Sequence, residues 1–226
     1  MKPPPDPSAK LDWRDGDVPV STRFDDPYFS LENGLEETRH VFLSGNDLPS
    51  RFRFGFHVAE LGFGTGLNLL ATLQAWRETG QEGMLRYTSF EAFPITPEEM
   101  RRAQFAFPAL SAVAADLAPH WGAEYITLAD LDFRLVTGDA RTTLPHWHRT
   151  ADAWFLDGFS PAKNPELWEE PLMAQVFAHT KPDGTAATYT AAGFVRRGLQ
   201  SAGFEVTRIP GYGRKRHMTR AVKPAP

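Results

Sequence analysis

The sequence predicts an α/β fold with a mostly parallel sheet and helices on both faces. Short apolar segments alternate with segments of helical periodicity along the 226 residues, which is the pattern of a parallel sheet. Residues 151–156 are nearly all apolar, as in a central strand buried on both faces. Residues 54–79 read as a strand, a glycine turn and a helix, and residues 125–128 as a short extra strand.

Length and composition indicate one globular domain with a sizeable core. The chain is 42% hydrophobic and 23% charged and has no cysteine, which excludes disulfides, thiolate metal sites and cysteine nucleophiles. No signal peptide and no membrane-spanning run are visible, so we expect a cytoplasmic protein with no membrane partner. The net charge is −4, so any nucleic-acid binding must come from a local basic patch.

The first 53 residues precede the first core strand. Residues 1–10 are proline-rich and are expected to form a disordered tail. Residues 11–53 are acidic and irregular, and we interpret them as an N-terminal flank or lid with a short helix after Asn33. A solvated acidic connector explains the composition equally well. The main domain is then expected at residues 54–226.

The glycine turn is the most informative short motif. Gly62, Gly64 and Gly66 follow the first core strand, and Glu60 lies two positions before them. Glycine permits positive φ and close approach of a ligand, and the following helix N-terminus offers free N–H groups. The spacing lacks the third glycine of the dinucleotide fingerprint and the lysine of the phosphate-binding loop, since Leu67 occupies both positions. A glycine turn between core elements, without a ligand, is the alternative.

Acidic residues end three later strands. Glu91 lies about 25 positions after the last glycine, where a carboxylate can accept hydrogen bonds from ribose hydroxyls. Asp139 is placed to meet an adenine edge, and Asp157 ends the nearly all-apolar strand. Because parallel strands end at one edge of a sheet, we expect these carboxylates to converge on the glycine turn. Taken singly, each could instead be a helix cap, a turn residue or a surface charge.

Six stretches together resemble the MnmC/MnmD-type tRNA methyltransferases. They are residues 23–30, 33–39, 60–68, 90–94, 152–165 and 211–216. The run D-A-W-F-L-D-G-F-x-P-A-K-N-P at residues 152–165 is the most diagnostic, and the similarity spans about residues 11–221. The resemblance implies a Rossmann-like fold of the class I methyltransferases that use S-adenosylmethionine (SAM), with a mostly parallel seven-stranded sheet.

The resemblance also implies a reaction and a partner. Members of the family methylate the 5-aminomethyl group of (2-thio)uridine at the tRNA wobble position with SAM, giving 5-methylaminomethyl-(2-thio)uridine. Bifunctional members also carry a flavin-dependent oxidase domain, and this chain stops before such a domain. We therefore expect no FAD, no metal, and a monomer that binds the anticodon loop of tRNA.

The resemblance carries over to a set of cofactor-binding residues. They are Asn33, Glu60, Gly62, Phe63, Gly64, Gly66, Asn68, Glu91, Ala92, Asp139, Ala140 and Asp157. Together with Asn33, Tyr28 and Phe29 are expected to close over the cofactor. Asp157 is also the predicted catalytic residue, because it can accept a hydrogen bond from the substrate amine. We regard it as an orienting group first and a base second, since a nearby carboxylate also favours the ammonium form.

The target base must leave its stack and rest on apolar or aromatic side chains. Phe159, flanked by Pro161, is the predicted wall, with core packing as the alternative. Basic residues predicted to contact tRNA phosphates are Lys163, Arg214, Lys215 and Arg216, with Arg196, Arg197 and Arg220 as further candidates. A solvated charged face is the alternative for them.

Other functions stay open. A methyltransferase acting on a small-molecule amine, or an aminopropyltransferase using decarboxylated SAM, is the nearest enzymatic alternative. The missing fingerprint glycine argues against a nicotinamide-dependent oxidoreductase, and the retained Asp157 loop argues against a non-catalytic SAM- or RNA-binding module. The segment His146-Trp147-His148 does not predict a metal site, because no further ligand stands at useful spacing.

Overall fold

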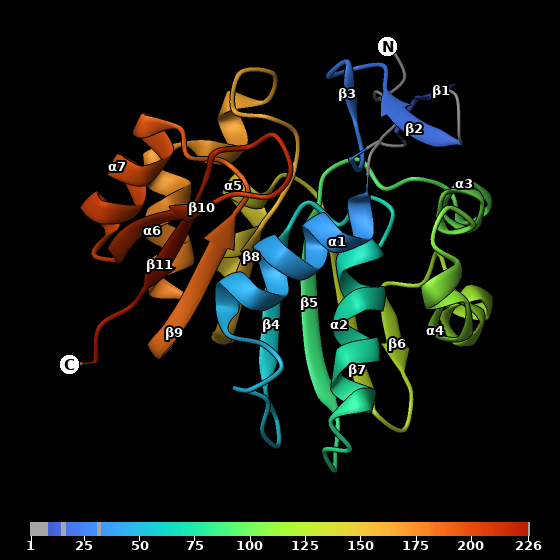
Figure 1. Cartoon of the computed structure of the whole chain (residues 1–226). Coiled ribbons are helices and arrows are strands. Elements are labelled where there is room, and N and C mark those ends of the chain that lie inside the picture. Colours follow the sequence, from blue (N-terminus) through green and yellow to red (C-terminus); the bar gives the residue numbers. More distant parts are fainter. Residues whose placement is uncertain (1–8, 15–16, 31–32, 226) are drawn as a thin grey trace.

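The computed structural model describes residues 9–14, 17–30 and 33–225, and an eight-stranded sheet lies at its centre (Figure 1). The strand order is β10-β11-β9-β8-β4-β5-β7-β6. The strands from β9 to β7 in this order are parallel, whereas β6, β10 and β11 pair antiparallel. The strands are β4 His57–Leu61, β5 Leu85–Glu91, β6 Tyr125–Thr127, β7 Leu131–Thr137, β8 Ala151–Leu156, β9 Thr180–Thr188, β10 Glu205–Pro210 and β11 His217–Val222.

The predicted α/β fold with a mostly parallel sheet is confirmed. The resemblance implies seven strands, and the eighth is the three-residue β6 at the edge, which corresponds to the short extra strand expected from the sequence. Ile126 in its middle is buried, while Tyr125 and Thr127 are exposed. One inward residue on an edge strand is enough to cover the rim of the core.

Helices cover both faces of the sheet (Figure 1). On one face lie the N-terminal helical segment, α2 and α4, and on the other α5, α6 and α7. The longer helices are α2 Leu67–Glu78, α3 Pro97–Gln104, α4 Ser111–Leu117, α6 Glu170–Ala178 and α7 Gly193–Ala202. The short turns are α1 Gly34–Thr38, η1 Arg39–Leu43, η2 Ser44–Asn46, η3 Pro108–Leu110, η4 Ala118–His120, α5 Ala140–Thr143, η5 Leu144–His146 and η6 Pro165–Trp168.

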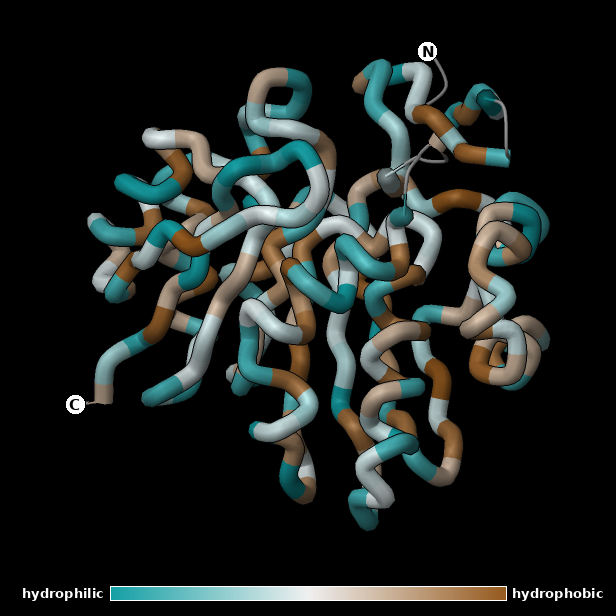
Figure 2. The backbone as a smooth tube through the Cα atoms, in the orientation of Figure 1, coloured by the Kyte–Doolittle hydropathy of each residue, from teal (hydrophilic) through white to brown (hydrophobic). Residues whose placement is uncertain are grey.

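Alternation along β8 divides the core into two layers. Ala153 and Phe155 pack with the cluster under α1 and α2, whereas Trp154 and Leu156 pack with the cluster under α6 and α7. All six residues of the strand are buried. A strand between two helical layers has no solvated face, which is why its sequence is a continuous apolar run rather than an alternating one. Figure 2 shows hydrophobic segments at the centre of the molecule.

The N-terminal flank is more ordered than the sequence suggests. Residues 11–27 contain a small antiparallel sheet of β1 Leu11–Arg14, β2 Val18–Ser21 and β3 Asp26–Pro27. The predicted helix after Asn33 is present, and Asn33 caps it by accepting a hydrogen bond from the Glu36 N–H. The helical segment buries four apolar side chains in the main core: Leu35, Val41, Phe42 and Leu43. The flank therefore packs into the same core as residues 54–226 rather than forming a solvated connector.

The last two residues of the predicted tail are ordered, and strand β9 contains an irregular stretch. Of the predicted tail, residues 1–8 lie outside the described residues, while Ala9 donates to the Pro94 carbonyl and Lys10 accepts from Thr22, so these two residues belong to the folded domain. Residues 181–184 lie inside β9, where the register advances from Ala151–Thr180 directly to Ala153–Thr185. The extra residues bulge from the strand, with Asp183 at a φ of 58°.

Among the described residues, no helix combines the length and apolarity needed to cross a bilayer. The cytoplasmic location and the monomeric state stay predictions.

Replacing Phe155 by alanine tests the core. Its ring is fully buried between Phe42 and Tyr87, so Phe155→Ala should lower the free energy of unfolding by about 3–5 kcal/mol in urea titrations. The matched control is Phe105→Ala, where the side chain is 83% exposed, and we expect a change within about 0.5 kcal/mol. Similar losses in both variants would contradict the burial.

Candidate active site

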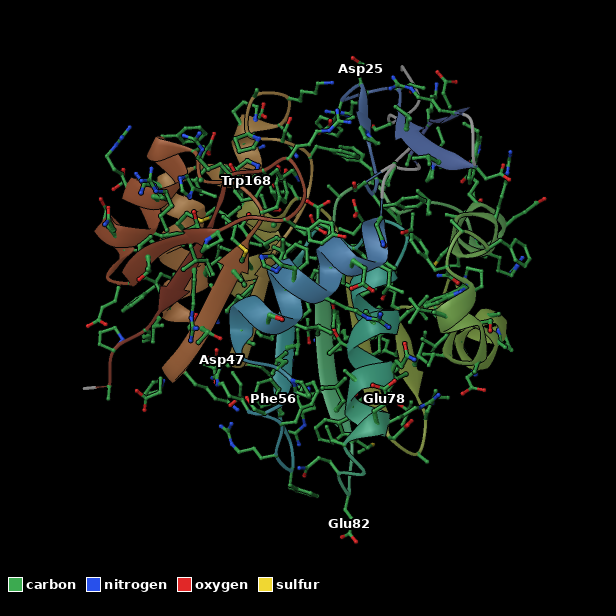
Figure 3. The ribbon with its side chains drawn as sticks, viewed as in Figure 1. Asp25, Asp47, Phe56, Glu78, Glu82 and Trp168 are labelled. Carbon is green, nitrogen blue, oxygen red and sulfur yellow. The ribbon has the colours of Figure 1, made fainter. Side chains whose placement is uncertain are left out.

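A cavity of about 800 Å³ lies at the end of the sheet where the parallel strands terminate. Its wall contains the glycine turn after β4 and the carboxylates of Glu91, Asp139 and Asp157, which follow three other strands. The predicted convergence of these strand ends is therefore confirmed. Figure 3 shows Asp25 and Trp168 at this end of the molecule, and Phe56 and Glu78 at the opposite end. The volume is in the range of small-ligand pockets.

The glycine turn is tightly packed against the end of β8. Gly62 has a φ of 82° and donates its N–H to the Phe90 carbonyl at 2.9 Å. A Cβ at this position would lie 3.0 Å from the Gly158 Cα, which is closer than most Cβ contacts in proteins, so the backbone at Gly158 would have to shift. Gly64 and Gly66 also have positive φ, and Gly66 precedes the first residue of α2. Glycine is thus required both for backbone conformation and for close approach.

Two buried side chains support the glycine turn through hydrogen bonds. Gln104 donates to the Thr65 carbonyl at 2.9 Å, and the Trp121 indole N–H donates to the Gln104 side-chain oxygen at 3.2 Å. Trp121 comes from the stretch of residues 108–130, for which the sequence predicts no function. This stretch therefore supports the glycine turn.

Asn68 connects four elements beneath the cavity. Its amide nitrogen donates to Glu60 Oε1 and to Asp157 Oδ2, both at 2.8 Å, and its amide oxygen accepts from the Thr38 hydroxyl at 2.9 Å. Glu60 also accepts from the Ser89 hydroxyl at 2.7 Å. Two donated bonds and one accepted bond of the Asn68 side chain thus join α1, α2, β4 and the end of β8.

Asp157 faces the cavity from the tip of β8. Burial raises the pKa of its carboxyl from 3.8 to about 6, and hydrogen bonds from Gly158 N–H and Asn68 oppose that rise. The charge of Glu37 raises this pKa further, and that of Lys215 lowers it. Both side chains therefore lie within electrostatic reach of Asp157. A carboxyl with this pKa can carry a negative charge near neutral pH and still take up a proton.

Glu91 and Asp139 are also in the wall, each already bonded to nearby backbone. Glu91 accepts from Gly64 N–H at 3.1 Å and Phe93 N–H at 2.8 Å, while burial raises its pKa. Asp139 caps α5 through the Arg141 N–H and pairs with the Arg141 guanidinium at 2.7 Å, which lowers its pKa. Glu91 ties the glycine turn to β5, and Asp139 fixes the first turn of α5.

Phe159 belongs to an aromatic wall of the cavity. Its ring stacks on Phe24, with centroids 4.7 Å apart, and meets Tyr28 edge-on at 5.1 Å. The Trp168 indole N–H donates to the Phe159 carbonyl at 3.0 Å, and Ser160 N–H donates to Asp26 Oδ2 at 2.8 Å. The loop after β8 is therefore bound to the N-terminal flank, and Phe159 is lined up against the cavity rather than buried in the core.

Two lysines predicted to contact phosphates are engaged by acidic residues of the flank. Lys163 bonds to the Asp25 carbonyl and lies 3.3 Å from the Asp25 carboxylate and 3.9 Å from that of Asp26. Lys215 Nζ donates to Glu37 Oε1 at 2.6 Å and lies 4.2 Å from the centre of the Tyr189 ring. Arg220 likewise pairs with Asp47. Each of these three cations has a carboxylate partner within the fold, and their contact with tRNA phosphates stays a prediction.

The predicted site residues divide into two groups. The cavity is lined by Phe63, Asn68, Ala92, Ala140, Phe159, Arg214 and Lys215, together with Gly62, Gly64 and the three strand-end carboxylates. Those outside the lining are Asn33, Glu60, Gly66, Pro161, Lys163 and Arg216. Glu60 is completely buried, which raises its pKa well above the usual range. It supports Asn68 rather than contacting the cavity.

Sequence reasoning missed several lining residues, of which Tyr189 and Glu37 matter most. Tyr189 directly follows β9 and its hydroxyl donates to the Gly158 carbonyl at 2.8 Å. The rule that strand ends carry site residues could have found it. Glu37 lies on α1, and its place in the wall depends on how α1 packs, which no local pattern reveals.

Residues 109–224, slightly more than half of the chain, match the family described as S-adenosyl-L-methionine-dependent methyltransferase. The chain belongs to this family. It is 48% identical, over 97% of its length, to the tRNA 5-methylaminomethyl-2-thiouridine biosynthesis bifunctional protein MnmC of Caulobacter sp. (strain K31), and 44% identical, over 93%, to the protein of that name from Aeromonas hydrophila. The chain spans only 39% and 34% of the lengths of these relatives.

The crystal structure of MNMC2 from Aquifex aeolicus has the same fold. It superposes with a TM-score of 0.76 at 25% identity, covering 99% of this chain and 73% of that chain. The similarity therefore includes the N-terminal flank as well as the sheet.

The cavity residues of this methyltransferase fit SAM. Gly62 and Gly64 line the cavity without a side chain, so a ligand in the cavity can approach the backbone of the turn closely. An added Cβ at Gly64 would meet the Tyr28 ring at 3.1 Å. Carboxylates at the ends of β5 and β7 suit hydroxyl and amine donors of a nucleoside with an amino-acid tail. Among the described residues, no cluster of three or more metal-ligating side chains occurs.

Gly62→Ala tests the close packing of the turn. Gly80 also has positive φ, 64°, but an added Cβ there meets nothing within 4 Å, so Gly80→Ala should cost only about 1–2 kcal/mol of backbone strain. Gly62→Ala should cost more and weaken SAM binding at least about 10-fold in calorimetric titration, because the ends of β4 and β8 must separate. Equal SAM affinity in the two variants would argue against a cofactor cradle at this turn.

Asp157 should make stability pH-dependent. Because its pKa is higher in the folded than in the unfolded chain, the folded protein binds more protons between pH 3.8 and about 6, and wild type loses stability as pH rises through this window. The unfolding free energy of Asp157→Asn relative to wild type should therefore rise by about 1–3 kcal/mol from about pH 4 to about pH 7. A constant difference in urea titrations would contradict the raised pKa.

Proposed function

We propose that this chain transfers a methyl group from SAM to the 5-aminomethyl group of (2-thio)uridine at the tRNA wobble position, giving 5-methylaminomethyl-(2-thio)uridine. The observation that carries the proposal is that the Asp157 carboxylate and the aromatic ring of Phe159 line the same cavity. It occurs in a SAM-dependent methyltransferase that is 43–48% identical to proteins named for biosynthesis of this nucleoside. The substrate is thus an amine attached to a base.

Cofactor binding is assigned to the strand ends. The backbone of Gly62 and Gly64 would carry the amino-acid part of SAM, with Glu91 for the ribose and Asp139 with Ala140 for the adenine. Bound SAM supplies a methyl group on a sulfonium, which is already a good leaving group. Phe63, Ala92 and Asn68 complete the walls of the same cavity.

Asp157 is assigned the role of binding and orienting the substrate amine. A free alkylamine is mostly protonated near neutral pH, and only its neutral form has the lone pair for attack. The Asp157 carboxylate can accept an N–H hydrogen bond and so direct the lone pair away from itself, toward the methyl donor. Its pKa of about 6 also lets it accept the released proton transiently. Asn68 and Gly158 N–H hold both carboxylate oxygens, so the orientation is fixed before the substrate arrives.

Phe159 provides the surface for the base. The uracil ring must leave the anticodon loop and find an aromatic or apolar face. Phe24 and Tyr28 hold the Phe159 ring in one orientation, so it offers a rigid wall rather than a mobile side chain. The partner is therefore the anticodon loop of a tRNA, consistent with the names of the relatives.

Asp157→Asn tests the reaction. With labelled SAM and purified tRNA carrying 5-aminomethyluridine, the wild type should label the wobble nucleoside, and the variant should be slower by about 100-fold or more with SAM affinity changed by less than about 10-fold. The control Asp183→Asn changes an exposed aspartate in β9, away from the cavity, and should retain activity.

Label in small amines without RNA, and none in any tRNA, would contradict the proposal and identify a small-molecule amine methyltransferase. Intact SAM binding with no transfer to either substrate would indicate a binding module.

A further inference from the structure

Charge is strongly segregated along the chain. From Gly184 to the C-terminus there are eight lysines and arginines and a single carboxylate, Glu205, whereas the first 183 residues contain 16 lysines and arginines and 27 carboxylates. A basic C-terminal part in a chain of net charge −4 is unusual enough to indicate an anionic partner. The basic residues lie mainly on α7 and on the hairpin of β10 and β11.

Not all of these cations are available. Lys215 and Arg220 are paired with Glu37 and Asp47, and Lys223 Nζ donates to the carbonyls of Phe177 and Thr180. In contrast, Arg196, Arg197, Arg208 and Arg216 have no carboxylate partner among the residues that the structure describes. The buried Arg196 Nε also has no hydrogen-bond acceptor within the described part of the chain.

Three of these arginines gather around His217. In the hairpin, Pro210 pairs with His217 and Arg208 pairs with Thr219. Arg208 and His217 are therefore diagonal neighbours on the same face of the hairpin. Arg196 is in the first turn of α7, which packs against that face through Val195 and Leu199. Partial burial and the charges of Arg208, Arg216 and Arg196 all lower the pKa of His217. We call Arg196, Arg208, Arg216 and His217 the hairpin cluster.

The hairpin cluster lies beside the mouth of the cavity. The loop from Gly211 to Arg216 joins β10 to β11, and its Tyr212 and Arg214 line the cavity. The N-terminal end of α7 and the start of β11 are at the same end of the sheet as the glycine turn, since β11 runs antiparallel to β9. Figure 2 shows the loop between β10 and β11 as hydrophilic. An extended anion could therefore run along the hairpin while one of its units enters the cavity.

Resting on the proposed function, we propose that the hairpin cluster is the phosphate-binding surface for the tRNA backbone next to the modified base. Arginine suits this role because its planar guanidinium can bind phosphate oxygens through two hydrogen bonds. Polyanion binding balances the charge of arginines that have no carboxylate partner among the described residues. The surface does not recognise the base sequence of the tRNA. It fixes the position of the RNA strand relative to the cavity.

The test is the salt dependence of tRNA binding, measured by fluorescence anisotropy with full-length protein between about 50 and 200 mM salt. Arg208→Gln combined with Arg216→Gln should weaken binding about 10-fold at the lower salt and make the slope of log K against log salt shallower by about 2. The matched control combines Arg86→Gln with Arg101→Gln, which replace two exposed arginines on β5 and α3. It removes the same amount of charge from the protein at positions outside the hairpin cluster. The control should keep the wild-type slope.

An unchanged slope in the hairpin variant, or an equal change in the control, would overturn the proposal. SAM affinity and thermal unfolding temperature are measured on each variant and should match wild type, which separates lost contacts from lost folding. If the wild type methylates tRNA but the hairpin variant keeps the wild-type salt slope, the proposed phosphate-binding surface is wrong and the proposed function stands. If the hairpin governs tRNA binding but no tRNA is methylated, the surface stands and the proposed reaction is wrong.

Discussion

The buried hydrogen bonds of Asn68 are the interaction on which the site depends. One amide nitrogen serves both the Glu60 and Asp157 carboxylates, and the amide oxygen is held by Thr38. Leaving any of these buried groups without its partner costs about 1–3 kcal/mol, and more for a charged one. Because the four residues come from β4, the end of β8, α2 and the N-terminal helical segment, the same bonds that stabilise the fold also fix the orientation of the Asp157 carboxylate. A fold in which α1 failed to dock would leave that carboxylate loosely held.

Burial of carboxylates at the cavity has a cost that function explains. Burial raises the pKa of Glu60, Glu91 and Asp157 alike, so their charged forms are all disfavoured in the folded protein. Hydrogen bonds from backbone N–H groups, Asn68 and Ser89 offset part of this cost. Residues that destabilise a protein in this way are typical of binding and catalytic sites. Here they form a polar layer at the cavity, where the proposed function requires binding of a cofactor and of an amine.

The acidic N-terminal flank and the basic C-terminal part explain each other. The flank supplies Asp25 and Asp26 to Lys163 and Glu37 to Lys215, and its Phe24 and Tyr28 hold Phe159. It therefore neutralises the cations next to the cavity and shapes the aromatic wall. Farther out on α7 and the hairpin, four arginines have no carboxylate partner among the described residues: Arg196, Arg197, Arg208 and Arg216. An uncharged aromatic wall beside a positive surface suits a nucleotide whose base enters and whose phosphates stay outside.

The sequence by itself determined the sheet, the glycine turn and the carboxylates at the strand ends, because periodicity and turn chemistry are local and parallel strands end at one edge. It also determined the helix after Asn33, whose apolar spacing is local too. Only the tertiary structure decided which cations are neutralised and which carboxylates reach the cavity. Lys163, Lys215 and Arg220 looked like Arg216 in the sequence, but their partners Asp25, Glu37 and Asp47 lie more than a hundred residues away. Glu60 looked like a ligand contact, yet burial under Asn68 makes it a support. Pairing and burial arise from contacts between distant segments, which no short stretch of sequence encodes.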